Sequence, residues 1–237
     1  MTTTQTTSIR TIPIKLSNQA QVVAEKRYFL KNDDNEVVED APAMFRRVAD
    51  AVASVETQYG KLDVDAQLSS NEFYTVMSNL DFIPNSPTLM NAGTKQGTLS
   101  ACFVLPLEDS MEGIMKAAHD TAMVQKFGGG TGFALSNLRP KGDRIKTTHG
   151  ISCGPIEVLK TLSRVSSMIT QGGKRDGANM AIMDIHHPDI LEFIECKKVE
   201  GEIHNFNISV GATDDFMKAV KAGTNYPLIN PRTKEIV

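Results

Sequence analysis

The sequence predicts an α/β protein, in which an N-terminal helical region is followed by an α/β domain. Up to about residue 83, apolar residues recur at spacings of three and four, the period of one buried helix face. After about residue 95, short apolar runs of strand-like composition alternate with helical periods. Such alternation is typical of domains in which some strands pair in parallel and ligands bind at loops gathered at one end of the sheet.

The first part of the chain is expected to hold an arm and a helical domain. We expect a flexible arm over residues 1–22, where Ser, Thr and Gln dominate and no amphipathic period is sustained. The helical domain should span residues 23–83, with Asp40 and Pro42 at the start of one helix. Its buried face carries Met44, Phe45, Val48, Ala51, Val52 and Val55, and a second helix repeats the pattern with Phe73, Val76, Met77 and Leu80.

The second domain is expected over residues 84–237, because a loop rich in proline begins there. Asp109 and Glu112 resemble a capping box at the start of a helix that three glycines at 128–130 would end. Two further helices are predicted over about 155–170 and from Pro188 onward. Strands are predicted at 99–105, 132–135, 179–183 and 205–210.

Two glycine-rich segments could bring a main chain close to a ligand. Residues 127–133 expose backbone N–H groups, although they match neither a Walker A motif nor a clean GxGxxG, and a helix cap with a tight turn explains them equally well. Residues 171–178 place Lys174 and Arg175 between glycines, where they could reach a phosphate or a base edge. A solvated basic turn is the alternative for that segment.

The cysteines and histidines do not form a metal motif. Cys102, Cys153 and Cys196 are far apart and show no CxxC spacing, so neither a disulfide framework nor a structural zinc site follows. By sequence texture alone, each is expected to be an inert packing residue. His186 and His187 are adjacent and suit the entry to a helix beside Pro188 better than metal ligation, so we expect no metal site.

The composition excludes some partners. The formal net charge of -3 offers no basic surface for a nucleic-acid polymer, although single nucleotides need only local cations. The polar start lacks the apolar core of a signal peptide, and no apolar run approaches the roughly 20 residues of a membrane span. We therefore expect a cytoplasmic protein that binds neither a nucleic-acid polymer nor a membrane.

An ordered series of segments resembles the large, catalytic subunit of ribonucleotide reductases. No single segment is decisive, but the order and spacing of the segments are specific to this family. Their residues resemble the adenosylcobalamin-dependent class II more than the class that works with a separate radical-generating protein. The segments are SPTLMNAG (86–93), LSACFVLPLEDSM (99–111), GGGTGF (128–133), LRPKGD (138–143), QGGKRDGANM (171–180) and HPDILEFI (187–194).

The resemblance implies a fold and a reaction. The fold would be a helical region followed by the first part of a ten-stranded α/β barrel. The reaction would convert ribonucleotides to 2′-deoxyribonucleotides for DNA synthesis, with adenosylcobalamin as cofactor, a thiyl radical and a thioredoxin-like dithiol donor. Cys102 would be one member of the redox-active cysteine pair. No Asn-x-Cys-x-Glu pattern for the radical cysteine occurs here, so we expect the chain to need a C-terminal reductase portion and to be inactive alone.

The resemblance also assigns binding roles. Asp109 would bind the ribose hydroxyl of a deoxynucleoside triphosphate effector, and Arg139 and Lys146 its phosphates. The effector site of this family lies at a subunit interface, so a homodimer is possible. Substrate contacts would come from Thr88, Ser100, Ala101, Gly130 and Arg175, and a specificity loop from Gln171, Gly172, Gly173, Lys174, Arg175 and Asn179.

Three alternatives stay open at this point. The chain could belong to the class I large subunit, which works with a separate radical-generating protein. It could instead be a non-catalytic regulatory module that binds deoxynucleotides, because the radical cysteine is missing. It could also be an incomplete gene product, whose exposed strand edges and apolar surface would cause aggregation.

Overall fold

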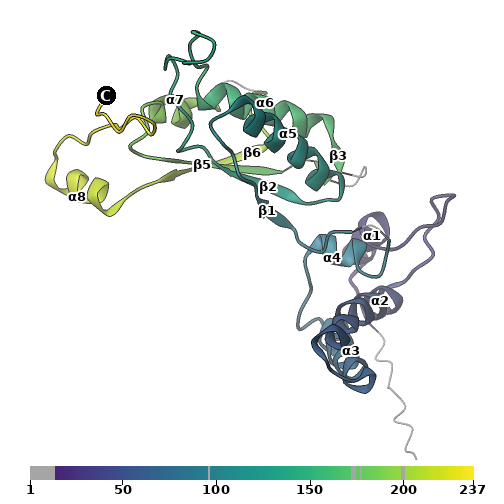
Figure 1. The fold of residues 1–237 in the computed structure, drawn as a ribbon. Helices are drawn as coiled ribbons and strands as arrows, with labels where there is room; N and C mark the ends of the chain where they lie inside the picture. Colours follow the sequence, from purple (N-terminus) through teal and green to yellow (C-terminus); the bar gives the residue numbers. More distant parts are fainter. Residues whose placement is uncertain (1–13, 96, 172–174, 177, 199–200) are drawn as a thin grey trace, which may run out of the picture. The chain divides into compact units, whose positions relative to one another are not determined.

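A computed structural model describes residues 14–95, 97–171, 175–176, 178–198 and 201–237, in two compact units (Figure 1). The first unit comprises residues 1–99 and is helical, and the second comprises residues 100–237 and holds a parallel sheet with helices. The predicted order of a helical region followed by an α/β domain is thereby confirmed. No helix in the described parts of the chain is long and apolar enough to cross a membrane.

The first unit contains four α-helices and one 3₁₀ helix in its described part. They are α1 (Asn18–Arg27), α2 (Ala41–Ala53), η1 (Ser54–Tyr59), α3 (Asp63–Ser78) and α4 (Ser86–Asn91). The Asp40 side chain caps α2 by accepting from the N–H of Ala43, and Pro42 stands in the first turn, as the sequence predicts. Of the expected arm, residues 1–13 lie outside the described residues, and α1 already begins within the remainder.

The core of the first unit is narrower than the sequence predicts. Met44, Phe45 and Val48 of α2 are buried, and Met77 of α3 packs in the same cluster. Four residues assigned to these buried faces are exposed by more than a third of their surface: Val52, Val55, Val76 and Leu80. Of these, Val55 lies beyond the end of α2 at Ala53, where the backbone tightens into a 3₁₀ helix, and Leu80 follows the end of α3.

The boundary between the units lies later than the sequence suggested. We expected the second domain to begin at residue 84, yet the first unit runs to Leu99 and includes α4. The reason is packing and hydrogen bonding, because Leu89 of α4 joins the core around α2. Arg47 of α2 also donates to the carbonyl oxygens of Leu89 at 3.1 Å and Ala92 at 2.6 Å, and its ion pair with Glu39 at 2.7 Å fixes its direction.

The second unit is built on a four-stranded parallel sheet in the order β1-β2-β5-β6. The strands are β1 (Cys102–Val104), β2 (Gly130–Ala134), β5 (Asn179–Asp184) and β6 (Phe206–Gly211), each within a few residues of a predicted strand. The helices are α5 (Met111–Lys126), α6 (Pro155–Met168), α7 (Ile190–Glu195) and α8 (Asp214–Ala222). A separate pair, β3 (Thr170–Gln171) and β4 (Arg175–Asp176), is antiparallel.

The two faces of the sheet differ. Phe133, Ala181, Met183 and Phe206 point to one face and pack in a core cluster with side chains of α5, α6 and α7. Figure 1 shows α5 and α6 side by side along the sheet. Residues of alternate parity on the strands are more exposed, with Val104 reaching 86%. The helices therefore cover one face, while the other presents Cys102 and apolar side chains.

Candidate functional site

A cavity of about 730 Å³ opens beside the start of α5. It brings together the three residues for which the sequence predicts effector binding, Asp109, Arg139 and Lys146. The remaining lining comes from the first turn of α5, the segment 138–154, the start of α6 and one residue near the C-terminal end: Ser110, Met111, Glu112, Ile114, Leu138, Ile145, Thr147, Thr148, Ser152, Cys153, Gly154, Val158 and Arg232.

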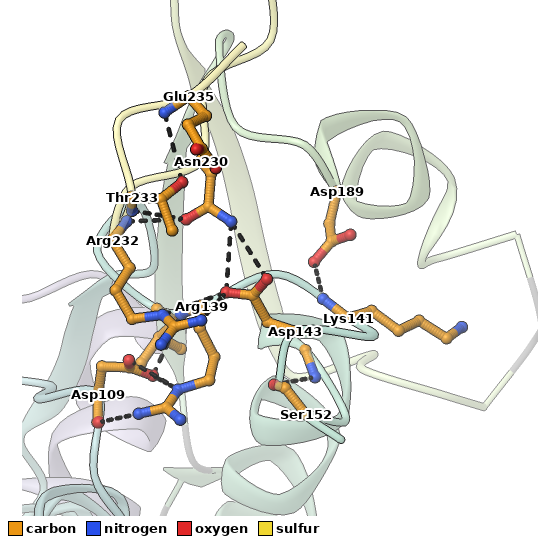
Figure 2. Close-up of polar contacts among 12 residues, drawn as sticks. Asp109, Arg139, Lys141, Asp143, Ser152, Asp189, Asn230, Arg232, Thr233 and Glu235 are labelled. Atoms are coloured by element: carbon orange, nitrogen blue, oxygen red, sulfur yellow. Dashed lines mark hydrogen bonds and ion pairs between the residues drawn. The ribbon is translucent and has the colours of Figure 1, made fainter. Parts of the chain in front are cut away.

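Asp109 and Arg139 are bonded to each other at the wall of this cavity (Figure 2). The guanidinium Nε of Arg139 donates to both carboxylate oxygens of Asp109, at 3.0 and 2.8 Å, and the Arg139 backbone N–H donates to Oδ1 at 3.1 Å. Nη2 adds a bond to the Asp109 carbonyl oxygen at 3.1 Å. Both side chains keep about a quarter of their surface exposed, so a ligand in the cavity can compete for either of them.

The helix cap at this point differs from the prediction. We expected Asp109 and Glu112 to form a capping box, but Ser110 is the N-cap and its Oγ accepts from the N–H of Gly113 at 3.0 Å. Met111 and Glu112 in the first turn of α5 still line the cavity, where the positive end of the helix dipole favours negative charge. The shift by one residue leaves the Asp109 carboxylate available for Arg139.

Hydrogen bonds with residues at the start of α7 fix the segment that carries Arg139. His187 is buried, and one ring nitrogen, Nδ1, accepts from the N–H of Asp189 at 3.1 Å. The other nitrogen, Nε2, must then carry the proton that it donates to the Leu138 carbonyl at 2.9 Å. Asp189 in turn accepts from the N–H of Lys141 at 2.8 Å. The chain is thus held by hydrogen bonds at Leu138 before Arg139 and at Lys141 after it. The helix-entry role predicted for the histidine pair is seen at His187.

The loop from residue 142 to 154 closes back on itself. Gly142 and Ser152 are joined by a backbone hydrogen bond of 3.0 Å, and the Ser152 N–H donates to the carbonyl of Asp143 at 2.8 Å. Gly154 then caps α6 with φ near 80°, and a Cβ there would lie 3.0 Å from the backbone nitrogen of Lys141. The loop therefore needs glycine at that position, and it presents Lys146 at the cavity.

The residues predicted to contact substrate lie in both units. Thr88, in the first unit, is buried, and its hydroxyl donates to the Leu99 carbonyl at 2.8 Å and approaches Asn85 Oδ1 at 3.0 Å. In the second unit, Ser100 and Ala101 lead directly into β1.

Cys102 stands in register with Gly130 on the neighbouring strand, and the Gly130 N–H donates to the Ala101 carbonyl at 2.7 Å. The thiol is exposed, which overturns the expectation of a buried packing residue, because β1 is an outer strand of the sheet and Cys102 lies on the face that the helices leave open. Gly130 begins β2, and the glycines before it form the turn from α5 to that strand.

Part of the predicted specificity loop lies outside the described residues, namely Gly172, Gly173 and Lys174. Gln171 and Arg175 on either side pair through their backbones in the β3–β4 ribbon. Asn179 does not lie in a loop: it is the first residue of β5, and its side chain is buried.

The Asn179 amide is saturated by neighbours on three other elements. Its Oδ1 accepts from Gln125 Nε2 at 2.7 Å and Thr131 Oγ1 at 2.6 Å, and its Nδ2 donates to Ser166 Oγ at 2.9 Å. These four side chains join α5, α6, β2 and β5, and the sequence did not predict that set. The sequence gives only a weak signal for such a network, because single polar residues often occur on otherwise apolar helix faces without forming one.

No group of three or more His, Cys, Asp or Glu side chains suited to a metal ion occurs among the described residues. Besides apolar side chains and the carboxylates of Asp109 and Glu112, the cavity is lined by two guanidinium groups, an ammonium group and hydroxyls, and these cations and hydroxyls suit a phosphorylated ligand.

Comparison with known proteins agrees with this organisation. Residues 14–97 match the all-alpha domain of ribonucleotide reductase, and residues 100–237 match its barrel domain. The change from one domain to the next coincides with the boundary between the two units.

Several curated proteins are similar over most of the chain. The vitamin B12-dependent ribonucleoside-diphosphate reductases of Thermoplasma acidophilum and Mycobacterium tuberculosis are 41% and 42% identical, each over 94% of this chain. The large subunit of the vaccinia virus ribonucleoside-diphosphate reductase is 36% identical over 87% of it. The matched regions are 36%, 32% and 26% of these relatives, so the chain spans about a third of their length or less. With domain matches that together cover nearly all of the described residues, the chain belongs to the ribonucleotide reductase large-subunit family.

Proposed function

We propose that the chain provides the effector site and one redox-active cysteine of a ribonucleotide reductase, which converts ribonucleotides to 2′-deoxyribonucleotides. The observation that carries the proposal is the cavity that unites Asp109, Arg139 and Lys146, three residues that the sequence resemblance assigns to one ligand. The family match and the exposed thiol of Cys102 support the catalytic half of the proposal.

A deoxynucleoside triphosphate fits the chemistry of the cavity. A carboxylate such as Asp109 accepts from a ribose hydroxyl, and guanidinium and ammonium groups bind phosphate oxygens through charge-assisted hydrogen bonds. Arg139 would exchange its bonds to the Asp109 carboxylate for bonds to phosphate, which frees Asp109 for the hydroxyl. Lys146, on the exposed loop, would add a second cation.

The position of α6 suggests how the effector would influence substrate choice. Val158 of α6 lines the cavity, and the same helix leads through residue 169 into the β3–β4 ribbon at Gln171 and Arg175. Movement of the loop 142–154 on effector binding would therefore reach the ribbon through one short helix. Coupling of two ligands through a loop with more than one arrangement is an allosteric mechanism, and we propose it for this chain.

Cys102 would act as one of two thiols that reduce the substrate. Each thiol would give up one electron and one proton as a disulfide forms between the two sulfurs. One proton would leave with the 2′-hydroxyl as water, and the other, with the two electrons, would become the new hydrogen on the 2′-carbon. Because Gly130 stands beside it in the sheet without a side chain, the thiol is open to a bound ribose. The second cysteine and the radical cysteine would come from a C-terminal reductase portion, and a thioredoxin-like dithiol donor would reduce the disulfide again.

Adenosylcobalamin is proposed as the cofactor on the names of the relatives from Thermoplasma acidophilum and Mycobacterium tuberculosis. We assign no described residue to the cobalamin: most of its binding surface would lie in the C-terminal reductase portion, and the cations of the cavity suit a phosphorylated ligand. The vaccinia virus relative favours the class I large subunit as the alternative, and a cytoplasmic location and a homodimer are proposed with the same family assignment.

The test is ribonucleotide reduction with adenosylcobalamin, a dithiol and a deoxynucleotide effector. We expect no activity from the chain alone and activity when it is combined with a C-terminal reductase portion that carries the radical cysteine. Cys102→Ser should abolish that activity, whereas Cys196→Ser, which alters a thiol that does not line the effector cavity, should retain it. Deoxynucleotide binding without activity in any combination would instead indicate a regulatory module.

A further inference from the structure

A third cation that the sequence did not predict lines the cavity. Arg232 lies near the C-terminal end, far from Asp109 and Arg139 along the chain, yet it borders the same space. Figure 2 shows its side chain running from the C-terminal turn toward Arg139. None of the residues assigned to nucleotide binding from the sequence comes from this part of the chain.

The turn that carries Arg232 is built to hold it in place. A single antiparallel β-bridge joins Ile229 and Ile236, and the N–H of Asn230 donates to the Glu235 carbonyl at 2.9 Å. The Asn230 side chain is buried, and its Oδ1 accepts from the N–H groups of Arg232 at 2.9 Å and Thr233 at 3.2 Å. The backbone at Arg232 is therefore fixed by an amide that belongs to the same turn.

Asp143 connects this turn to the loop on the far side of the cavity. Its carboxylate accepts from Asn230 Nδ2 at 3.2 and 3.3 Å, and from Arg232 Nη2 at 2.9 Å and Nε at 3.3 Å. Asp143 itself does not line the cavity, whereas Arg232 does. The acid thus occupies the Nε–Nη2 edge of the guanidinium and leaves Nη1 for a ligand in the cavity that Arg232 lines.

The free edge of Arg232 is chemically suited to phosphate. The bonds to Asp143 use Nε and Nη2, so Nη1 has no partner among the described residues, and 31% of the side chain is exposed. Arg139 is arranged in the same way, with Nε and Nη2 bonded to Asp109. Two guanidinium groups, each paired with an acid through Nε and Nη2, therefore border one cavity together with Lys146. Planar guanidinium edges bind phosphate oxygens in pairs.

We infer that Arg232 is a further binding residue for the polyphosphate of the nucleotide in this cavity, and that Asp143 and Asn230 are its positioning residues. The inference rests on the proposed function, because it takes the ligand to be a deoxynucleoside triphosphate. A triphosphate is strongly anionic, and because Asp109 and Glu112 also line the cavity, Arg139 and Lys146 alone would only balance these acids, whereas Arg232 gives the lining a positive net charge.

The test is equilibrium binding of dATP and of deoxyadenosine to the chain and to three variants. Arg232→Ala and Arg232→Gln remove the cation, and Lys234→Ala removes a cation from the same turn that does not line the cavity. Loss of one charge-assisted contact is worth roughly a tenfold to hundredfold rise in Kd. We expect that rise for dATP with both Arg232 variants, no change with Lys234→Ala, and no change in deoxyadenosine binding with any variant.

Each other outcome points elsewhere. An unchanged dATP Kd in a folded Arg232→Ala or Arg232→Gln chain overturns the inference and leaves the proposed effector site intact. Equal losses in the Arg232 and Lys234 variants also overturn it, because they indicate a general effect of net charge. If the unaltered chain binds no dATP, the proposed effector site itself fails, and the inference fails with it. Circular dichroism of each variant identifies any that does not fold, and the second Arg232 variant then decides.

Discussion

At the scale of single residues, Asn179 is the clearest case of a side chain with a structural task. Its amide oxygen accepts hydrogen bonds from Gln125 and Thr131, and its amide nitrogen donates one to Ser166, all inside the second unit. We predicted it as part of a specificity loop, and a residue fixed in this way would act on such a loop only by anchoring its C-terminal end. A buried amide with several partners is expensive to remove, because the partners stay buried without bonds.

We predict that Asn179→Ala lowers the free energy of unfolding by about 2–4 kcal/mol. The matched control is Asn207→Ala on β6, where the side chain is exposed, and that change should cost less than about 0.5 kcal/mol. Urea denaturation followed by circular dichroism measures both values. Equal small effects would show that the buried bonds of Asn179 contribute little to stability.

The three cysteines are predicted to differ in reactivity. Burial raises the pKa of the Cys196 thiol, so less of it is thiolate at a given pH, whereas Cys102 and Cys153 are exposed. Because the thiolate is the nucleophile, alkylation of Cys196 by iodoacetamide should be slower at pH 7.5 and should rise only at higher pH than for an ordinary thiol. Peptide mass spectrometry across a pH series gives the three rates. Labelling of Cys196 as fast as Cys102 at pH 7.5 would contradict the prediction.

At the scale of elements, the loop between β2 and α6 depends on one glycine more than on another. Gly142 and Gly154 both have positive φ, but a Cβ meets nothing within 4 Å at Gly142 and meets the backbone of Lys141 at Gly154. Both substitutions therefore carry the cost of a positive φ, and Gly154→Ala adds the steric overlap and, with ψ near 171°, a backbone region that is essentially restricted to glycine.

We predict that Gly142→Ala costs about 1–2 kcal/mol of stability, from the left-handed backbone alone. Gly154→Ala should cost roughly 1–3 kcal/mol more, because the start of α6 must move away from Lys141. Thermal denaturation of the two variants measures the difference. The same shift should weaken dATP binding in Gly154→Ala, since Lys146 and Ser152 lie on the displaced loop.

The elements also show what can be predicted from the sequence. The parallel strands and α2, α5, α6 and α7 were predicted within a few residues, because their apolar periods are clear and glycine or proline bounds most of them, whereas α1, α4 and α8 were not predicted as helices. The cap of α5 was wrong by one position, since Asp109 and Ser110 are both good capping residues and only the bond to Arg139 decides between them. Arg232 was missed because local patterns carry no information about a partner some 90 residues away.

At the scale of the whole molecule, the open face of the sheet has consequences for solution behaviour. Parallel sheets are normally covered on both faces, yet Val104, Met180 and Ile182 are 86%, 46% and 38% exposed on the face away from α5 and α6. Contiguous apolar surface of this kind promotes association.

We predict that the chain alone self-associates as its concentration rises, and that Val104→Thr shifts the distribution toward the monomer. Ile151→Thr serves as the control, because Ile151 is 74% exposed but lies on the loop rather than on the sheet, and it should have no such effect. Sedimentation velocity over a concentration series distinguishes the variants. A monomer at all concentrations, or an equal response to both changes, would exclude the sheet face as the cause.

The bond between Asp109 and Arg139 means that the carboxylate proposed for the ribose hydroxyl and the guanidinium proposed for the phosphates are already paired with each other. A phosphate that enters must displace a carboxylate, and a ribose hydroxyl must compete with a guanidinium, so each half of a nucleotide alone meets an occupied partner. When one molecule carries both halves, the phosphate releases the carboxylate that the sugar needs. Binding of one end of the ligand should therefore favour binding of the other. The binding free energy of dATP should be more favourable than the sum of the binding free energies of deoxyadenosine and tripolyphosphate measured separately.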